Sequence, residues 1–96
     1  MEIALPKSRR AGKQYAVRIG TNTVHVGASR YADFTMHRDP KRKARYLARH
    51  KHENWSDPTT AGFWSRWLLW NKPSIAESVQ DLKNRGFKVL VKFQSV

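Results

Sequence analysis

All four tryptophans of the chain lie between Trp55 and Trp70, and this cluster limits the possible folds more than any other feature. Fully burying one tryptophan side chain is worth roughly 2 to 3 kcal/mol or more. The chain has no cysteine, so neither disulfides nor thiolate metal sites contribute and stability comes from packing. Because 96 residues suit one domain, we expect the tryptophan segment to form the centre of a single core.

The segment before the tryptophans is strongly basic. It reads RDPKRKARYLARHK from Arg38 to Lys51, with Asp39 as its only acid. The whole chain carries 19 Lys and Arg against 7 Asp and Glu, a formal net charge of +12. Such an excess opposes compaction unless a polyanionic partner neutralises it. Nucleic acid is the first candidate partner, an acidic protein surface the second and anionic lipid the third, because no segment pairs a basic face with an exposed apolar face.

Residues 1–12 are predicted to form a basic N-terminal arm outside the domain. Arg9 and Arg10 lie in this stretch, and an extended basic arm can track phosphates, with a solvated terminus as the alternative. The apolar piece at its start is too short for a signal peptide. No run approaches the ~20 apolar residues that cross a bilayer, so we expect no membrane insertion.

The remaining residues, 13–96, are predicted to form one α+β domain. Alternating apolar residues indicate strands over residues 13–19, 23–28 and 87–93, the first two joined by a turn at Gly20. Residues 29–37 are expected to form an irregular connection. Helical spacing and capping residues indicate helices over residues 41–55, 61–71 and 75–85. The capping signals are Asp39 before Pro40 for the first helix, Thr59 or Thr60 for the second, and Ser74 with Glu77 at the start and Gly86 at the end of the third. The expected architecture is a three-stranded antiparallel sheet, made of the N-terminal hairpin plus the C-terminal strand and packed by about three helices. The tryptophan helix is expected to be the middle layer.

The basic helix over residues 41–55 is predicted to be the binding element. Its arginines, together with Arg38, fall near the positions i, i+4, i+7 and i+11, which align guanidinium groups along one face. Its inward stripe is predicted to consist of Ala44, Leu47 and Ala48.

On the helix over residues 61–71, helical spacing places Trp67 and Trp70 with Trp64 in the core and leaves Ser65, Arg66 and Leu69 to face outward. Trp55 is the exception, because it follows the basic helix beside a turn and could stack on a nucleic-acid base next to Arg66.

The basic helix carries side chains that suit two kinds of chemistry, hydrolysis and metal binding. Tyr46, Arg49, His50 and Glu53 project from one face, where a base beside a phosphate-binding arginine would suit hydrolysis. Hydrogen bonding of these polar groups around the Asp57 turn is favoured, because a short chain has little room for a cleft. We therefore expect no catalytic residue.

A metal site is also not expected. Its candidate ligands would be His50, His52, Glu53 and Asp57 with His37 nearby, but they follow no recognised ligand spacing and His52 points away from the shared helix face. No residue pattern indicates a cofactor. The predicted polyanion-binding set is therefore purely basic and aromatic, and comprises Arg9, Arg10, Arg38, Lys41, Arg42, Lys43, Arg45, Arg49, Lys51, Trp55 and Arg66.

Two long stretches carry a resemblance to a known family. They read VHVGASRYADFTMHRDPKRKARYLARHKHENW and, shortly after it, TAGFWSRWLLWNKPS, and they cover roughly residues 13–80. This pattern resembles an uncharacterised family of small basic proteins of giant viruses, the nucleocytoplasmic large DNA viruses. The resemblance implies a large icosahedral DNA virus and a disulfide-free host cytoplasm. It implies no active site that could be assigned to residues of this chain.

Two function classes follow from charge, size and this resemblance. The first is a non-enzymatic virion component, either a minor capsid or a genome-associated protein, whose cationic helix binds DNA or an acidic capsid surface. The second is a small nuclease or a host-directed nucleic-acid-binding factor. The first is favoured, with localisation in the virion and in the host cytoplasm or viral factory.

Overall fold

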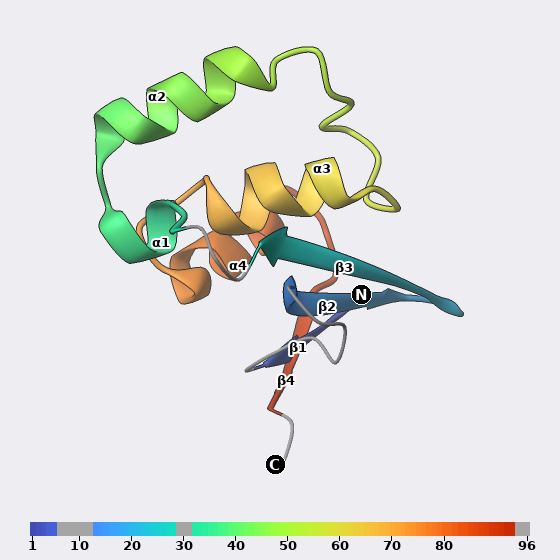
Figure 1. Ribbon diagram of the computed structural model, residues 1–96. Helices are drawn as coiled ribbons and strands as arrows, with labels where there is room; N and C mark the ends of the chain where they lie inside the picture. The colour runs from blue at the N-terminus through green and yellow to red at the C-terminus, as the bar shows by residue number, and fades with distance from the viewer. Residues whose placement is uncertain (6–12, 29–31, 94–96) are drawn as a thin grey trace.

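The computed structural model describes residues 1–5, 13–28 and 32–93, and it confirms a small α+β fold (Figure 1). Its elements, in chain order, are β1 (Glu2–Leu5), β2 (Lys13–Ile19), β3 (Asn22–Ala28), α1 (Phe34–His37), α2 (Pro40–Arg49), α3 (Ala61–Trp64), the π-helical segment η1 (Ser65–Leu69), α4 (Ile75–Asn84) and β4 (Leu90–Phe93). In Figure 1, α3 lies between α2 and the sheet, so the tryptophan helix is the middle layer, as predicted.

The sheet is mixed and has four strands in the order β3-β2-β1-β4, where the sequence predicted three antiparallel strands. β1 lies inside the segment predicted to be an arm. It pairs antiparallel with β2 and parallel with β4, so the last strand joins β1 and not the hairpin. Ile3, opposite Val17 and Val91, is fully buried. Four residues are too few to show an alternation of apolar and polar residues, so the sequence did not predict this strand.

The β2–β3 hairpin forms as predicted. Ile19 pairs with Asn22, which leaves Gly20 and Thr21 as a two-residue loop. Gly20 has a φ of +59°, and a positive φ at the first loop position is what tight hairpin turns require. The inward residues Val17 and Val26 are buried in the core.

The tryptophan helix is not a regular α-helix. The Trp70 N–H donates to the Ser65 carbonyl at 3.0 Å, a bond that spans five residues instead of four. This wider turn brings both Leu68 and Leu69 into the core, whereas regular spacing had placed Leu69 outside. At its start, Thr60 accepts a hydrogen bond from the Phe63 N–H, which confirms the predicted cap.

The tryptophans therefore differ in burial. Trp64 is fully buried, and its Nε1–H donates to the Pro58 carbonyl at 2.7 Å. Trp67 and Trp70 were predicted to be core residues, but both are only half-buried and pack against the edge of the core.

Two connections differ from the sequence predictions. α2 ends at Arg49 and not near Trp55, because His50 and Glu53 bond to each other through side chain and backbone and close a turn. Residues 34–37 were expected to be irregular, but they form the short helix α1, whose cap is Asp33.

The end of α4 follows the predicted capping pattern. Ser74 accepts a hydrogen bond from the Glu77 N–H at the N-terminus. Gly86, with a φ of +96°, ends the helix, and the Phe87 N–H reaches back to the Leu82 carbonyl. The chain then enters β4 with Val89 buried.

Candidate nucleic-acid interface

α2 is attached to the domain by aromatic stacking. Tyr46 is its buried residue, and its ring lies parallel to that of Trp70 with the centroids 4.4 Å apart. His50 stacks on Tyr46 with a centroid distance of 4.4 Å, and the Tyr46 hydroxyl donates to Ser65 Oγ at 2.9 Å. The predicted inward stripe was therefore wrong, because Ala44 and Ala48 are exposed. Burying the Tyr46 ring with its hydrogen-bonded hydroxyl stabilises the packing of α2 more than burying the methyl groups of Ala44 and Ala48 would.

Three arginines of α2 line a cavity of about 530 Å³ between α2 and the body of the domain. Arg42, Arg45 and Arg49 stand at i, i+3 and i+7, so they project from one side of the helix, next to Tyr46. The other lining residues are Gly27, Ala32, Asp33, Tyr46, His50, Ser65, Leu69 and Trp70. The structure thus brings together three of the predicted arginines in one concave site.

These three arginines have no carboxylate partner within the part of the chain that the structure describes. Carboxylates of the described residues contact other groups: Asp33, Asp39 and Asp57 accept hydrogen bonds from backbone N–H groups, Glu53 contacts His50, and Asp81 accepts from Arg85 and Asn71. None of the three guanidinium groups is therefore neutralised by a direct ion pair with a described residue.

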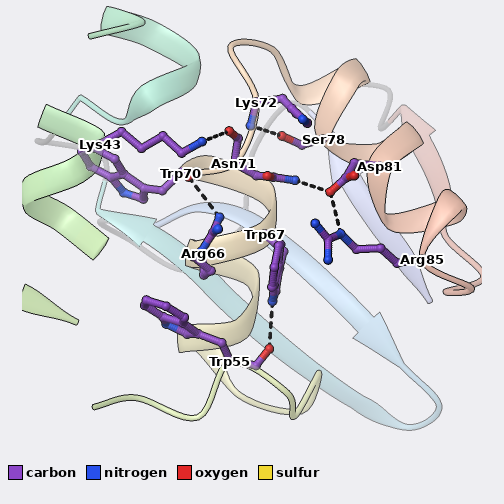
Figure 2. Close-up of polar contacts among 10 residues, drawn as sticks. All are labelled: Lys43, Trp55, Arg66, Trp67, Trp70, Asn71, Lys72, Ser78, Asp81 and Arg85. Atoms are coloured by element: carbon purple, nitrogen blue, oxygen red, sulfur yellow. Dashed lines mark hydrogen bonds and ion pairs between the residues drawn. The ribbon is translucent and has the colours of Figure 1, made fainter. Parts of the chain in front are cut away.

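Two other predicted residues hold α2 in place instead of facing the cavity. Lys43 Nζ donates to the Asn71 carbonyl at 2.6 Å (Figure 2). It also lies 5.0 Å from the centre of the Phe34 ring. Burial lowers the pKa of Lys43, and the nearby Arg66 and Lys72 lower it further. Arg38 Nε donates to the Pro73 carbonyl at 3.2 Å. Both cations therefore connect the α1–α2 region to the segment that follows η1.

Trp55 and Arg66 belong to a different cluster and do not line the cavity. Figure 2 shows Arg66 and Arg85 on opposite sides of the Trp67 ring, with guanidinium carbons 4.2 and 4.3 Å from its centre. Arg66 also lies 5.4 Å from the centre of the half-buried Trp55 ring. Cations thus cover both faces of Trp67 and contact Trp55, which leaves less ring surface for base stacking than the sequence suggested.

The remaining predicted residues are not brought to the cavity. Lys41 and Lys51 are exposed at the two ends of α2, where they add positive charge. Arg9 and Arg10 lie outside the described residues.

The histidines and acids of the turn after α2 do not assemble a metal site. No group of three or more His, Asp or Glu side chains is close enough to hold a metal ion within residues 1–5, 13–28 and 32–93. His50 Nδ1 instead contacts a Glu53 carboxylate oxygen at 2.5 Å. Over the same residues, no helix has the length and apolar character needed to span a membrane.

Residues 3–50 match the model of a family of unknown function, DUF5754. The chain belongs to this family. The DUF5754 segment runs from β1 to the end of α2, so it includes Arg42, Arg45 and Arg49 but ends before the tryptophan helix. No curated protein and no solved structure is significantly similar to the chain.

Sequence reasoning missed Asp33, which lies inside the DUF5754 segment and lines the cavity. Its side chain is buried, and Oδ1 accepts hydrogen bonds from the N–H and the hydroxyl of Thr35. Oδ2 is buried without a partner. Burial raises the pKa of Asp33, while the Thr35 hydrogen bonds oppose this rise. The Asp-x-Thr spacing at the start of α1 was the signal available in the sequence.

Proposed function

We propose that this protein is a non-enzymatic nucleic-acid-binding protein that holds the phosphate backbone of DNA against α2. One observation carries the proposal: Arg42, Arg45 and Arg49 line the same cavity wall without a carboxylate partner. Guanidinium groups bind phosphate through paired N–H donors, and neutralised phosphates release counterions. Three unpaired like charges on one helix face repel each other, and this repulsion destabilises the free protein. An anionic ligand would reduce the repulsion.

DNA is favoured over an acidic protein surface by the distribution of the cations. Part of the net charge of +12 lies on the three arginines that line the cavity and on Lys41 and Lys51 near the two ends of α2. A continuous phosphate backbone can contact such a spread, whereas an acidic patch on a protein would have to match it group by group.

The resemblance to the giant-virus family supports a setting for this binding. We propose that the protein is a virion component of a large DNA virus, either a minor capsid or a genome-associated protein, present in the viral factory or host cytoplasm before assembly. Mass spectrometry of purified, nuclease-treated virions tests this setting. Absence of the protein from such particles would contradict it.

A salt titration tests the binding itself. If the protein contacts ~5 phosphates of duplex DNA, the logarithm of the affinity should fall with the logarithm of salt concentration at a slope of about −4 to −5. Fluorescence anisotropy with labelled duplexes of unrelated sequence measures this slope, which should depend little on sequence. Failure to bind at low salt, or affinity that is independent of salt, would exclude DNA as the partner.

A small nuclease is the second candidate, and one contact favours it. His50 lines the same cavity as the three arginines, and its Nδ1 contacts the Glu53 carboxylate. Such a contact orients an imidazole ring that acts as a general base. We expect no cleavage of DNA or RNA with magnesium, manganese or EDTA. Cleavage that copurifies with the folded protein and disappears in the double variant His50→Ala, Glu53→Gln would establish the nuclease instead.

A further inference from the structure

A second group of cations lies outside the arginine cavity, on the other flank of α2. This second cation cluster consists of Lys43, Arg66, Lys72 and Arg85, and none of these residues lines the cavity (Figure 2). Helical spacing places Lys43 and the three cavity arginines on either side of the buried Tyr46, roughly 100° or more apart around the helix axis. The two groups of cations therefore belong to separate surfaces of the domain.

The positive charges of the second cation cluster lie close enough to affect one another. Burial lowers the pKa of both Lys43 and Arg66, and neighbouring cations lower them further. Arg66 and Lys72 act on Lys43 in this way, and Arg85 acts on Arg66. Among the described residues, Asp81 is the carboxylate that contacts the cluster, through Arg85 Nε at 2.8 Å. One carboxylate cannot balance the cluster, so a bound anion would reduce the repulsion within it.

Two members of the cluster have donors that no described residue uses. Lys72 is exposed, and its ammonium group forms no hydrogen bond within the described residues. Arg85 bonds through Nε alone, which leaves its terminal N–H groups available on a side chain that is 49% exposed. Its guanidinium carbon lies 4.3 Å from the centre of the Trp67 ring, so the group is held in place. A positioned guanidinium with free terminal N–H groups is suited to paired hydrogen bonds with phosphate.

Packing on tryptophan does not account for the whole cluster. Arg66 and Arg85 cover the two faces of the Trp67 ring, as Figure 2 shows. Lys72 lies over no aromatic ring and forms no ion pair among the described residues. An exposed lysine beside two arginines that already repel it is explained by an anionic ligand and not by the stability of the free protein.

We propose that Lys72 and Arg85, with the half-buried Arg66, form a second phosphate-binding surface, so that one protein molecule holds two DNA segments together. This inference rests on the proposed binding of DNA by α2 and adds the bridging of DNA to it. Two duplexes repel each other through their backbones, and a domain with cations on two separate surfaces neutralises phosphates of both. A single binding surface would neutralise only one.

Energy transfer between two duplexes tests the bridging, with one duplex carrying a donor dye and the other an acceptor dye. The wild-type protein should produce energy transfer at 0.1 M salt. The double variant Lys72→Gln, Arg85→Gln should need about 60-fold more protein for the same transfer, because each phosphate contact is worth about eightfold at this salt concentration. Its affinity for a single duplex should fall less than about tenfold, because the three arginines of α2 are unchanged.

A matched double variant controls for net charge. Arg18 and Lys88 are exposed, do not line the cavity and lie outside the second cation cluster. Changing both to glutamine removes the same two charges and should leave the energy transfer close to that of the wild-type protein. A cooperative thermal melt of both double variants shows that each is folded.

The outcomes separate the two proposals. The second surface would be overturned by a wild-type protein that binds each duplex without energy transfer, or by equal transfer in the wild type and in Lys72→Gln, Arg85→Gln. A 60-fold loss of affinity for a single duplex in this double variant would also overturn it, because one duplex would then contact both surfaces. Each of these results leaves DNA binding by α2 intact. Absence of binding to a single duplex at low salt would overturn both proposals.

Discussion

Trp64→Ala is expected to lower the melting temperature by at least about 12 °C. Trp64 is fully buried, and removing a buried tryptophan side chain costs about 3 to 5 kcal/mol. The Pro58 carbonyl also loses the donor that lies 2.7 Å away. Small domains hold only about 5 to 15 kcal/mol, and in a chain of this size each kcal/mol moves the melting temperature by about 4 to 8 °C. Thermal denaturation followed by circular dichroism measures the shift.

Trp67→Ala is the matched control for this prediction. Trp67 is half-buried, and its substitution removes a hydrogen bond to the Trp55 carbonyl and contacts with two guanidinium groups, which are worth about 1.5 to 3.5 kcal/mol together. Regular helical spacing had placed Trp67 in the core, where its removal would nearly unfold the domain. A larger loss of stability in Trp67→Ala than in Trp64→Ala would show that the π-turn of η1 is wrongly placed.

Replacing Arg42, Arg45 and Arg49 together with glutamine should lower the affinity for duplex DNA about 500-fold at 0.1 M salt. A slope of 0.9 per phosphate contact makes each contact worth about eightfold at this salt concentration, and three contacts multiply. The slope of the salt titration should also become less steep by about 2.7. The three side chains form no ion pair in the described structure, so the fold should tolerate the change.

A second triple variant controls for net charge. Arg18, Lys83 and Lys88 are exposed and do not line the cavity, and changing them to glutamine removes the same three charges. We expect a loss of affinity below about tenfold, because distant exposed charges are largely screened at 0.1 M salt. Equal losses of affinity in the two triple variants would mean that overall charge determines binding, and not the three arginines of α2 that line the cavity.

Local sequence signals predicted the elements whose ends are set by their own residues. The hairpin followed from alternating apolar residues around Gly20, and the start of α2 followed from Asp39 before Pro40. Ser74 and Gly86 marked the two ends of α4 for the same reason. In each case a side chain or a backbone angle within a few residues decides the structure, so no distant contact is needed.

Distant contacts decided the features that the sequence did not predict. β1 is a strand because Ile3 packs between two other strands, and the four residues alone show no pattern. The inward face of α2 is set by Trp70, which the π-turn directs toward Tyr46.

The candidate site divides along the same line. Its arginines were predictable from their helical spacing, whereas the buried Asp33 was not, because its burial depends on how α2 covers the domain.

The parallel pairing of β1 with β4 has a consequence for how the chain folds. Residues 2–5 and 90–93 are adjacent in the sheet, and the Leu90 N–H donates to the Met1 carbonyl at 2.8 Å. Contacts between such distant segments require closure of a loop that includes nearly the whole chain, which slows folding. The sheet can be completed only when residues 90–93 reach residues 2–5. The segment that matches the family, residues 3–50, therefore lacks the edge strand β4 and the tryptophan core that complete this fold.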